Sequence, residues 1–283
     1  MDVFRTAANP WGQEVLVGIA WDLMWLAIIA SALFVVGHAV WIAAKGRTEA
    51  VPVPGQAPAG VPEKVKRHSL SARAFHWLMS LAMFGLLVTA FVPVLGIQFA
   101  WVTLHWIAGV ILVVAILYHI VHATVFQDFW AMWVTPRDLG PGMEELKHSL
   151  GAGSGPPPKA GKYPFDHQLF HHLAAATSGG AILTGLLMMV RVDTPFWTRN
   201  PYLLGDGTWG IVYVLHGLSG VALIGLIAAH IYFAIRPEKR WITWSMFRGW
   251  IHRDHYLAHH DPAKWDVTDG SGGPRSDSPA TGD

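Results

Sequence analysis

The sequence contains no cysteine. This absence excludes disulfides, iron–sulfur clusters held by thiolates and covalently attached c-type haem, so any redox centre in the chain must use other ligands. Charged residues are also scarce, at 14% of 283 residues, whereas soluble domains carry about 25%. Hydrophobic residues make up 52%, and the net charge of +1 gives no sign of a nucleic-acid partner. The composition therefore indicates a protein embedded in membrane lipid.

Apolar runs long enough to cross a bilayer occur five times along the chain. The first is too long for a cleaved signal peptide and has only Arg5 before it, so we expect it to be a true span. The sequence therefore predicts an all-α integral membrane protein, a helical bundle of five spans. The expected spans are residues 15–44, 75–96, 100–126, 169–190 and 209–235.

Lysine and arginine are distributed unevenly over the connections between these spans. Residues 45–74 contain six, residues 127–168 four and the segment after residue 235 seven, against three on the other side. Cytoplasmic loops carry the excess of positive charge in membrane proteins. We therefore expect the N-terminus outside and the C-terminus and both longer loops in the cytoplasm.

The last span contains two histidines, His216 and His230, in an otherwise apolar run. Fourteen residues on an α-helix rise about 21 Å and return to nearly the same face. Polar side chains at that depth are costly and mark ion, proton or cofactor sites. Gly220, one turn beyond His216, leaves room for a flat group. The spacing favours two haems with one axial ligand each from this helix, over two core histidines bonded to neighbouring helices.

Three further histidines are candidates for the opposite ligands. By topology His105 shares the outer level with His216, and His76 shares the inner level with His230. An internal repeat adds a competitor, because residues 104–123 align without a gap with residues 215–234 and place His119 at the level of His230. On spacing alone, His76 and His119 are both open as the inner ligand.

The motifs resemble those of the cytochrome b subunits of membrane-bound formate dehydrogenases and nickel–iron hydrogenases, in the dihaem cytochrome b561-like superfamily. The resemblance covers about residues 65–267. It rests on Arg73-Ala-Phe-His76-Trp77, Leu104-His105-x-x-x-Gly109 and the spacing of His216 and His230. The formate dehydrogenase γ-subunit is favoured by Gly161-Lys162-Tyr163 and by the tail from Met246-x-x-Gly249 to His259-His260-Asp261-Pro262-x-Lys264-Trp265.

The resemblance implies two b haems, an outer one between His105 and His216 and an inner one between His76 and His230. It favours His76 over His119, because His119 is not a ligand in the family pattern. Quinone, either menaquinone or ubiquinone, is implied beside the inner haem near the start of the fourth span, where Pro164 replaces the family's asparagine. The further residues that we associate with the cofactors are Arg73, Gly109 and Gly220 for haem, and Tyr163, Asp166, His167 and His171 for quinone and its protons.

The resemblance divides the chain into an extra N-terminal transmembrane helix (1–50), a linker (51–68), a dihaem cytochrome b domain with a cytoplasmic interfacial tail helix (69–267) and a disordered tail (268–283). The expected function is electron transfer from a periplasmic formate dehydrogenase-type partner, with iron–sulfur and catalytic subunits, to quinone. The chain itself has no substrate-oxidising site. The alternatives are a subunit of a hydrogenase or other periplasmic oxidoreductase, a free-standing b561-type carrier, and a histidine-lined metal or proton transporter.

Overall fold

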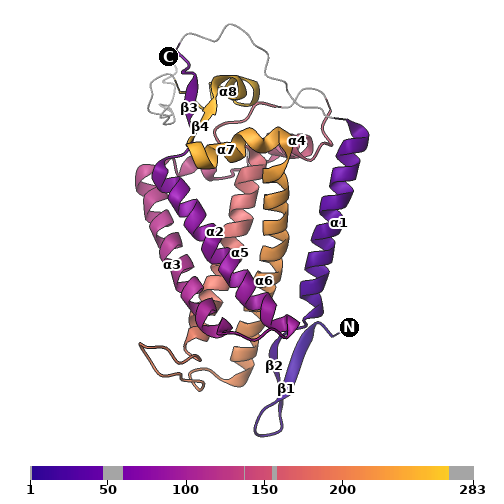
Figure 1. Cartoon of the computed structure of the whole chain (residues 1–283), viewed down its shortest axis with the longest axis vertical. Helices are drawn as coiled ribbons and strands as arrows, with labels where there is room; N and C mark the ends of the chain where they lie inside the picture. The colour runs from indigo at the N-terminus through magenta and orange to yellow at the C-terminus, as the bar shows by residue number, and fades with distance from the viewer. Residues whose placement is uncertain (1, 47–59, 137, 155–157, 268–283) are drawn as a thin grey trace. The chain divides into compact units, whose positions relative to one another are not determined.

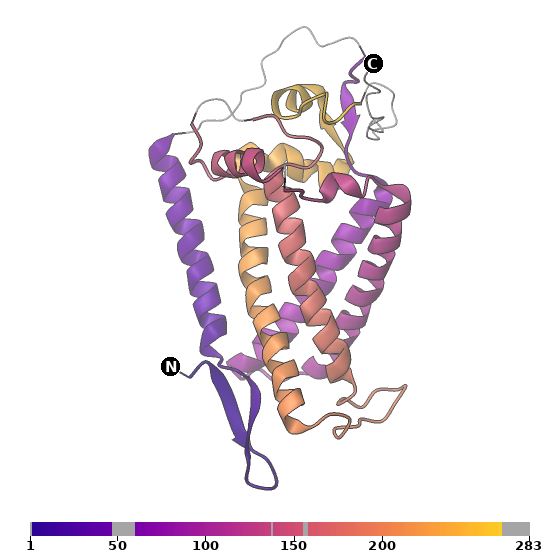
Figure 2. The same cartoon turned by 180° about the vertical axis from the view of Figure 1, so that it is seen from behind.

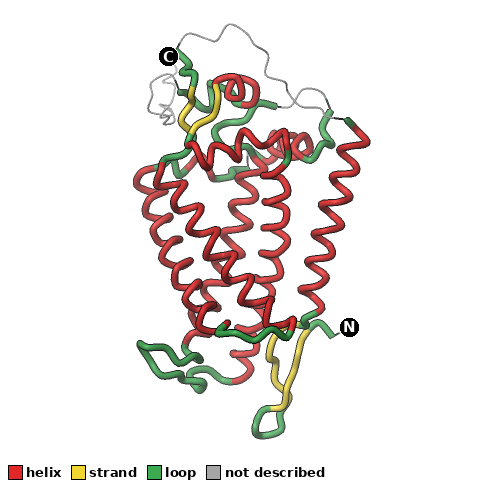
Figure 3. Tube along the Cα trace, in the orientation of Figure 1, coloured by secondary structure: helices red, strands yellow, loops and turns green. Residues whose placement is uncertain are grey.

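The computed structural model describes residues 2–46, 60–136, 138–154 and 158–267. Helices make up most of this part of the chain, and its named strands form two short antiparallel pairs (Figure 3). The expected disordered tail, residues 268–283, and the first half of the expected linker, residues 51–59, lie outside the described residues. Within the linker range, however, residues 64–66 form a strand.

Five helices are long and apolar enough to cross a membrane, which confirms the predicted five-span helical bundle. The chain is a multi-pass membrane protein. Four of the five both begin and end within about five residues of the predicted bounds, because the ends of an apolar run mark the ends of a span. The spans are α1 (Asp22–Lys45), α2 (Leu70–Phe91, extended by the 3₁₀ turn η1, Val92–Leu95), α3 (Trp101–Phe126), α5 (Phe165–Met189) and α6 (Asp206–Ile235).

The first span begins later than predicted, because the residues before it form a hairpin. Strands β1 (Phe4–Ala8) and β2 (Glu14–Ile19) pair antiparallel. The Asn9 side chain accepts hydrogen bonds from the backbone N–H groups of Trp11 and Gln13, at 3.0 and 2.9 Å, and so closes the turn. The β-branched residues of β2 suit a strand as well as an apolar helix, so hydropathy alone could not separate them.

Two compact units divide the chain, and the division falls within all five spans, α1, α2, α3, α5 and α6. The first unit comprises residues 1–41, 76–117 and 172–232. In it, α1 lies on the α6 side of the bundle, away from α3 (Figures 1 and 2). The hairpin packs on α6 so closely that Cβ atoms added at Gly210 and Gly217 would lie within 3 Å of Leu16 and Ile19.

A polar contact joins α1 to α6 in the same unit. Nδ1 of His38 lies 2.8 Å from the Tyr232 hydroxyl, and the His38 side chain is only 8% exposed. His38 is thus a buried contact between two spans, flanked by the rings of Phe34 and Trp41.

The second unit comprises residues 42–75, 118–171 and 233–283, of which the described part holds the short elements. A small core of Val61, Val65, Ile251, Tyr256, Trp265 and Val267 supports them. The tail was predicted to form one interfacial helix, but Gly249, at φ +86°, ends the first helix and a strand follows. The elements are β3 (Lys64–Lys66), η2 (Trp130–Met132), α4 (Leu139–Ser149), η3 (Pro237–Lys239), α7 (Arg240–Arg248), β4 (Trp250–His252) and α8 (Arg253–His259).

Candidate functional site: paired imidazoles and a polar cavity

The first unit brings four histidines together as two pairs. His105 on α3 faces His216 on α6, with ring centroids 6.2 Å apart and ring planes at 71°. His76 on α2 faces His230 on α6, with centroids 6.3 Å apart and planes at 48°. Since α6 is continuous between its two histidines, the pairs are separated by about 21 Å along that helix.

The spacing within each pair fits a shared metal atom. A metal bound by one nitrogen of each ring, at about 2 Å, sets the two imidazole centroids about 6 Å apart. None of the four rings is fully buried, so each has surface that a large flat group could contact. The donor set is therefore suited to a bis-imidazole iron centre within a helical bundle.

Threonine hydroxyls orient both members of the outer pair. Thr89 Oγ lies 2.8 Å from Nδ1 of His105, and Thr184 Oγ lies 3.0 Å from Nδ1 of His216. Each hydroxyl also donates to a carbonyl four residues earlier, that of Gly85 or Gly180, at 2.7 and 2.6 Å. Because the hydroxyl proton is thus engaged, the threonine oxygen accepts from Nδ1–H. This fixes the tautomer and leaves the Nε2 lone pair of each histidine as the one that would bind a metal.

The inner pair is held differently. Nδ1 of His76 is buried and has no hydrogen-bond partner within the described residues. The nearby Ser80 hydroxyl donates instead to the His76 carbonyl at 2.7 Å. The two pairs therefore differ in the hydrogen bonding of their rings, which is one means by which a protein tunes a metal ligand.

The two predicted glycines differ in their surroundings. A Cβ added at Gly220 would meet nothing within 4 Å, so the α6 surface one turn beyond His216 has room for a flat group. A Cβ at Gly109 would make an ordinary contact with Leu86 at 3.9 Å. Gly185 on α5 is tighter, because a Cβ there would lie 3.3 Å from the His216 ring.

His119, the competing inner ligand, lies in the second unit and pairs with His171 of α5. The ring centroids of His119 and His171 are 6.3 Å apart, and Phe75 stacks on His119 at 4.1 Å with planes at 7°. In the same unit Arg73 donates from Nη1 to the Phe247 carbonyl. Nε of Arg73 is buried without a partner in the described part of the chain.

A second sequence repeat accounts for the pairing of His119 with His171, which is the third imidazole pair of the structure. Phe75-His76-x-Leu78 and Gly85-x-x-x-Thr89 on α2 match Phe170-His171-x-Leu173 and Gly180-x-x-x-Thr184 on α5. Together with the repeat of α3 and α6, this makes His171 the counterpart of His76 and His119 the counterpart of His230. The sequence analysis used only the α3 and α6 repeat and therefore missed Thr89, Thr184 and the pairing of His119 with His171.

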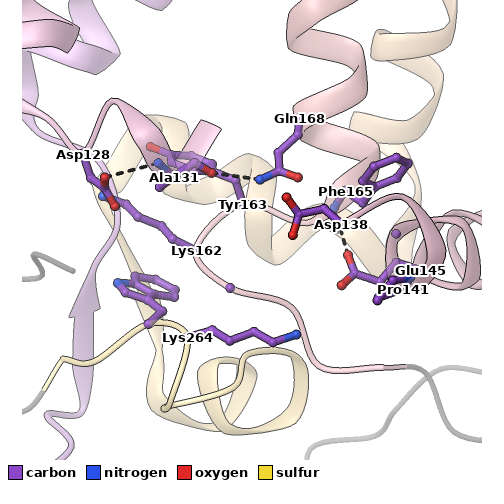
Figure 4. A pocket seen from close by; sticks show the side chains of 13 residues that line it. Asp128, Ala131, Asp138, Pro141, Glu145, Lys162, Tyr163, Phe165, Gln168 and Lys264 are labelled. Atoms are coloured by element: carbon purple, nitrogen blue, oxygen red, sulfur yellow. Dashed lines mark hydrogen bonds between the residues drawn. The ribbon is translucent and has the colours of Figure 1, made fainter. Parts of the chain in front are cut away.

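A polar cavity of about 370 Å³ lies in the second unit (Figure 4). Tyr163 lines it, whereas Asp166, His167 and His171 do not. Burial lowers the pKa of Lys162 and raises the pKa values of Tyr163 and Glu145. The residues that line the cavity are Asp128, Ala131, Asp138, Pro141, Gly142, Glu145, Gly161, Lys162, Tyr163, Phe165, Gln168, Lys264 and Trp265.

Two motifs used in the sequence comparison meet at this cavity. Residues 161–163 and residues 264–265 line it together. Nδ1 of the buried His260 donates to the Gly161 carbonyl at 2.6 Å, and Nε2 lies 3.1 Å from Nη1 of Arg67. Burial, together with the charge of Arg67, lowers the pKa of His260 to about 3, so the imidazole is neutral and accepts from the guanidinium.

The fold and the paired imidazoles define a membrane-spanning, haem-binding helical bundle. Residues 67–249 match the prokaryotic cytochrome b561 family, and the chain belongs to that family. It is thus a membrane cytochrome b that binds haem b and carries electrons. The match starts after α1, so the first span and its hairpin lie outside it. No curated protein matches the chain.

Proposed function

We propose that the chain is a dihaem cytochrome b subunit that passes electrons from a periplasmic oxidoreductase across the bacterial inner membrane to quinone. His105 and His216 would hold the outer haem, and His76 and His230 the inner one. Each haem, when bound, supplies a one-electron carrier. The observation that carries the proposal is the spacing of the two imidazole pairs, 6.2 and 6.3 Å between centroids, on opposite parts of α6.

The direction of transfer rests on the distribution of charge. The excess of lysine and arginine after α1, α3 and α6 supports a cytoplasmic position for these helix ends and for the C-terminus. His216 then lies toward the outside and His230 toward the cytoplasm. Electrons would be accepted on the outer side and delivered to quinone on the inner side. Residues 69–267 would form this dihaem domain, with residues 1–50 as an additional span.

A formate dehydrogenase-type enzyme is the proposed electron donor. Parts of the two motifs that favour this branch, residues 161–163 and residues 264–265 at the end of the tail motif, line one cavity, which supports a shared role for them. Tyr163 is the residue of the predicted quinone set that lines the cavity. Arg73, whose Nε is buried without a hydrogen-bond partner among the described residues, would pair with an acidic group of the inner haem.

Two measurements test the proposal. A pyridine haemochrome assay of the purified chain should give two b haems per polypeptide, and alanine at His105 or His216 should remove one. His122→Ala is a suitable control, because His122 lies on α3 but bonds Gln127. Purification in mild detergent should retain the periplasmic donor, whose identity decides between formate dehydrogenase and hydrogenase. Absence of haem with stoichiometric zinc would instead support a transporter.

A further inference from the structure

Glu145 on α4 connects the polar cavity to the start of α5. Its side chain lines the cavity, and its carboxylate accepts the backbone N–H of Phe165 at 2.9 Å (Figure 4). Burial raises the pKa of Glu145, and the carboxylates of Asp166 and Asp138 add to this increase. Glu145 is thus a carboxyl group that can exchange a proton with water in the cavity.

Asp166 lies next along this path. Its Oδ2 accepts the Ser149 hydroxyl at 2.5 Å and lies 3.8 Å from Nζ of Lys239. Ser149 follows Glu145 by one helical turn on α4, so both side chains reach the same end of α5. The facing groups are therefore Glu145 and Ser149 from α4, Lys239 from η3 and His167 from α5.

The path continues inward along α5. Nε2 of His167 lies 4.0 Å from Oδ1 of Asp166. His171 is one turn further on the same helix face, and its ring centroid is 6.3 Å from that of His119. Titratable side chains thus form a series from the cavity into the membrane-spanning part of the second unit. The 4.0 Å between His167 and Asp166 is a gap that a single water can bridge.

We propose that Glu145, Asp166 and His167 carry protons from cytoplasmic water in the cavity to His171 and His119, which supply them to quinone during its reduction. Quinone takes two electrons from the haem side and two protons by this route, and is released as quinol. The inference rests on the proposed function, and it assigns a use to the third imidazole pair. Each of these side chains returns to its initial protonation state at the end of a turnover.

The competing explanation is structural, because a carboxylate near the first turn of a helix also satisfies free N–H groups. Reduction of the haems by quinol in the full reconstituted chain distinguishes the proton route from this structural role. This reaction runs the route backwards and needs no partner enzyme. A water-soluble quinol is added to oxidised protein, and the rate of haem reduction is followed optically.

Asp166→Asn should slow this rate about 10²-fold, and Glu145→Gln about tenfold, with unchanged haem content and unchanged reduction by dithionite. Glu144→Gln is the matched control, because Glu144 is the neighbouring residue on α4 but is exposed and paired with Lys147. Acetate should restore part of the rate of Asp166→Asn by carrying protons itself. A structural role for Asp166 would not respond to acetate.

Wild-type rates in both variants would overturn the route while leaving the proposed function in place. Failure of quinol to reduce the wild-type haems would overturn the proposed function, and the route with it. If Asp166→Asn loses haem, Ser149→Ala is the second variant, since it keeps Asp166 and removes its hydroxyl partner. A slowed rate with normal haem content is expected there, and a wild-type rate would contradict the route.

Discussion

The hydroxyl of Thr89 lies 2.8 Å from Nδ1 of His105, while donating its own proton to the Gly85 carbonyl. Thr184 and His216 repeat this arrangement across the bundle. A histidine whose Nδ1–H is accepted by another group is a stronger electron donor to a metal at Nε2. His105 and His216 therefore differ electronically from His76, whose Nδ1 has no hydrogen-bond partner within the described residues.

Replacing Thr89 by valine should raise the midpoint potential of the outer haem, because the weaker imidazole donor favours the oxidised iron less. One hydrogen bond of about 1 kcal/mol corresponds to about 40 mV for a one-electron couple. Optical redox titration measures the shift. Thr124→Val is the control, since the Thr124 hydroxyl bonds only the α3 backbone at Ile120 and Val121. An equal shift in both variants would contradict the assignment.

His76→Ala should remove one haem, whereas His119→Ala should leave both. His76 faces His230 on α6, while His119 is paired with His171. Haem content of the purified variants, measured against protein, gives the answer. Loss of a haem from His119→Ala, with retention of both in His76→Ala, would show that the third imidazole pair is the inner ligand set.

Turnover should build a membrane potential that is negative on the cytoplasmic side, since electrons cross most of the bilayer between the two pairs. Vesicles containing the complete complex and a potential-sensitive dye test this. His230→Ala should abolish quinone reduction but still allow the partner to reduce the outer haem, while His216→Ala should prevent both. Quinone reduction without any potential would place the quinone site on the outer side.

Acid should loosen the second unit around His260. Its pKa of about 3 in the folded chain lies below the ordinary value of 6.5, so the unfolded chain binds the extra proton first. The stabilising contribution of neutral His260 is complete above pH 6.5 and is lost as the pH falls toward 3. The protection factors of the amides in the Gly161–Tyr163 segment, which correct the exchange rates for their intrinsic pH dependence, should fall over this range. His260→Asn, which keeps a donor for the Gly161 carbonyl, should flatten the dependence.

Hydropathy and charge predicted the five spans, because an apolar run of about 20 residues has few other stable states. The same signal could not show that residues 14–19 form a strand, since Val15 and Val17 fit either structure. Helical spacing and topology predicted His105, His216 and His230 as ligands, whereas the choice of His76 over His119 needed the family resemblance. The threonines could not be found from hydropathy, because a lone threonine in an apolar helix usually bonds only its own backbone. The repeat that relates α2 to α5 makes Thr89 and Thr184 equivalent, and it is too short to stand out without the histidine pairs of the structure.

The attachment of α1 to α6 has a consequence for assembly. The hairpin packs on Gly210 and Gly217, the Asn9 side chain lies 3.1 Å from Asp206, and His38 bonds Tyr232 near the other end of α6. These non-covalent contacts bind the hairpin and α1 to α6 along most of the length of α6. We therefore expect the first helix to act as a separable subunit: residues 1–46, co-expressed with the remainder as two polypeptides, should reassemble into one spectrally normal cytochrome.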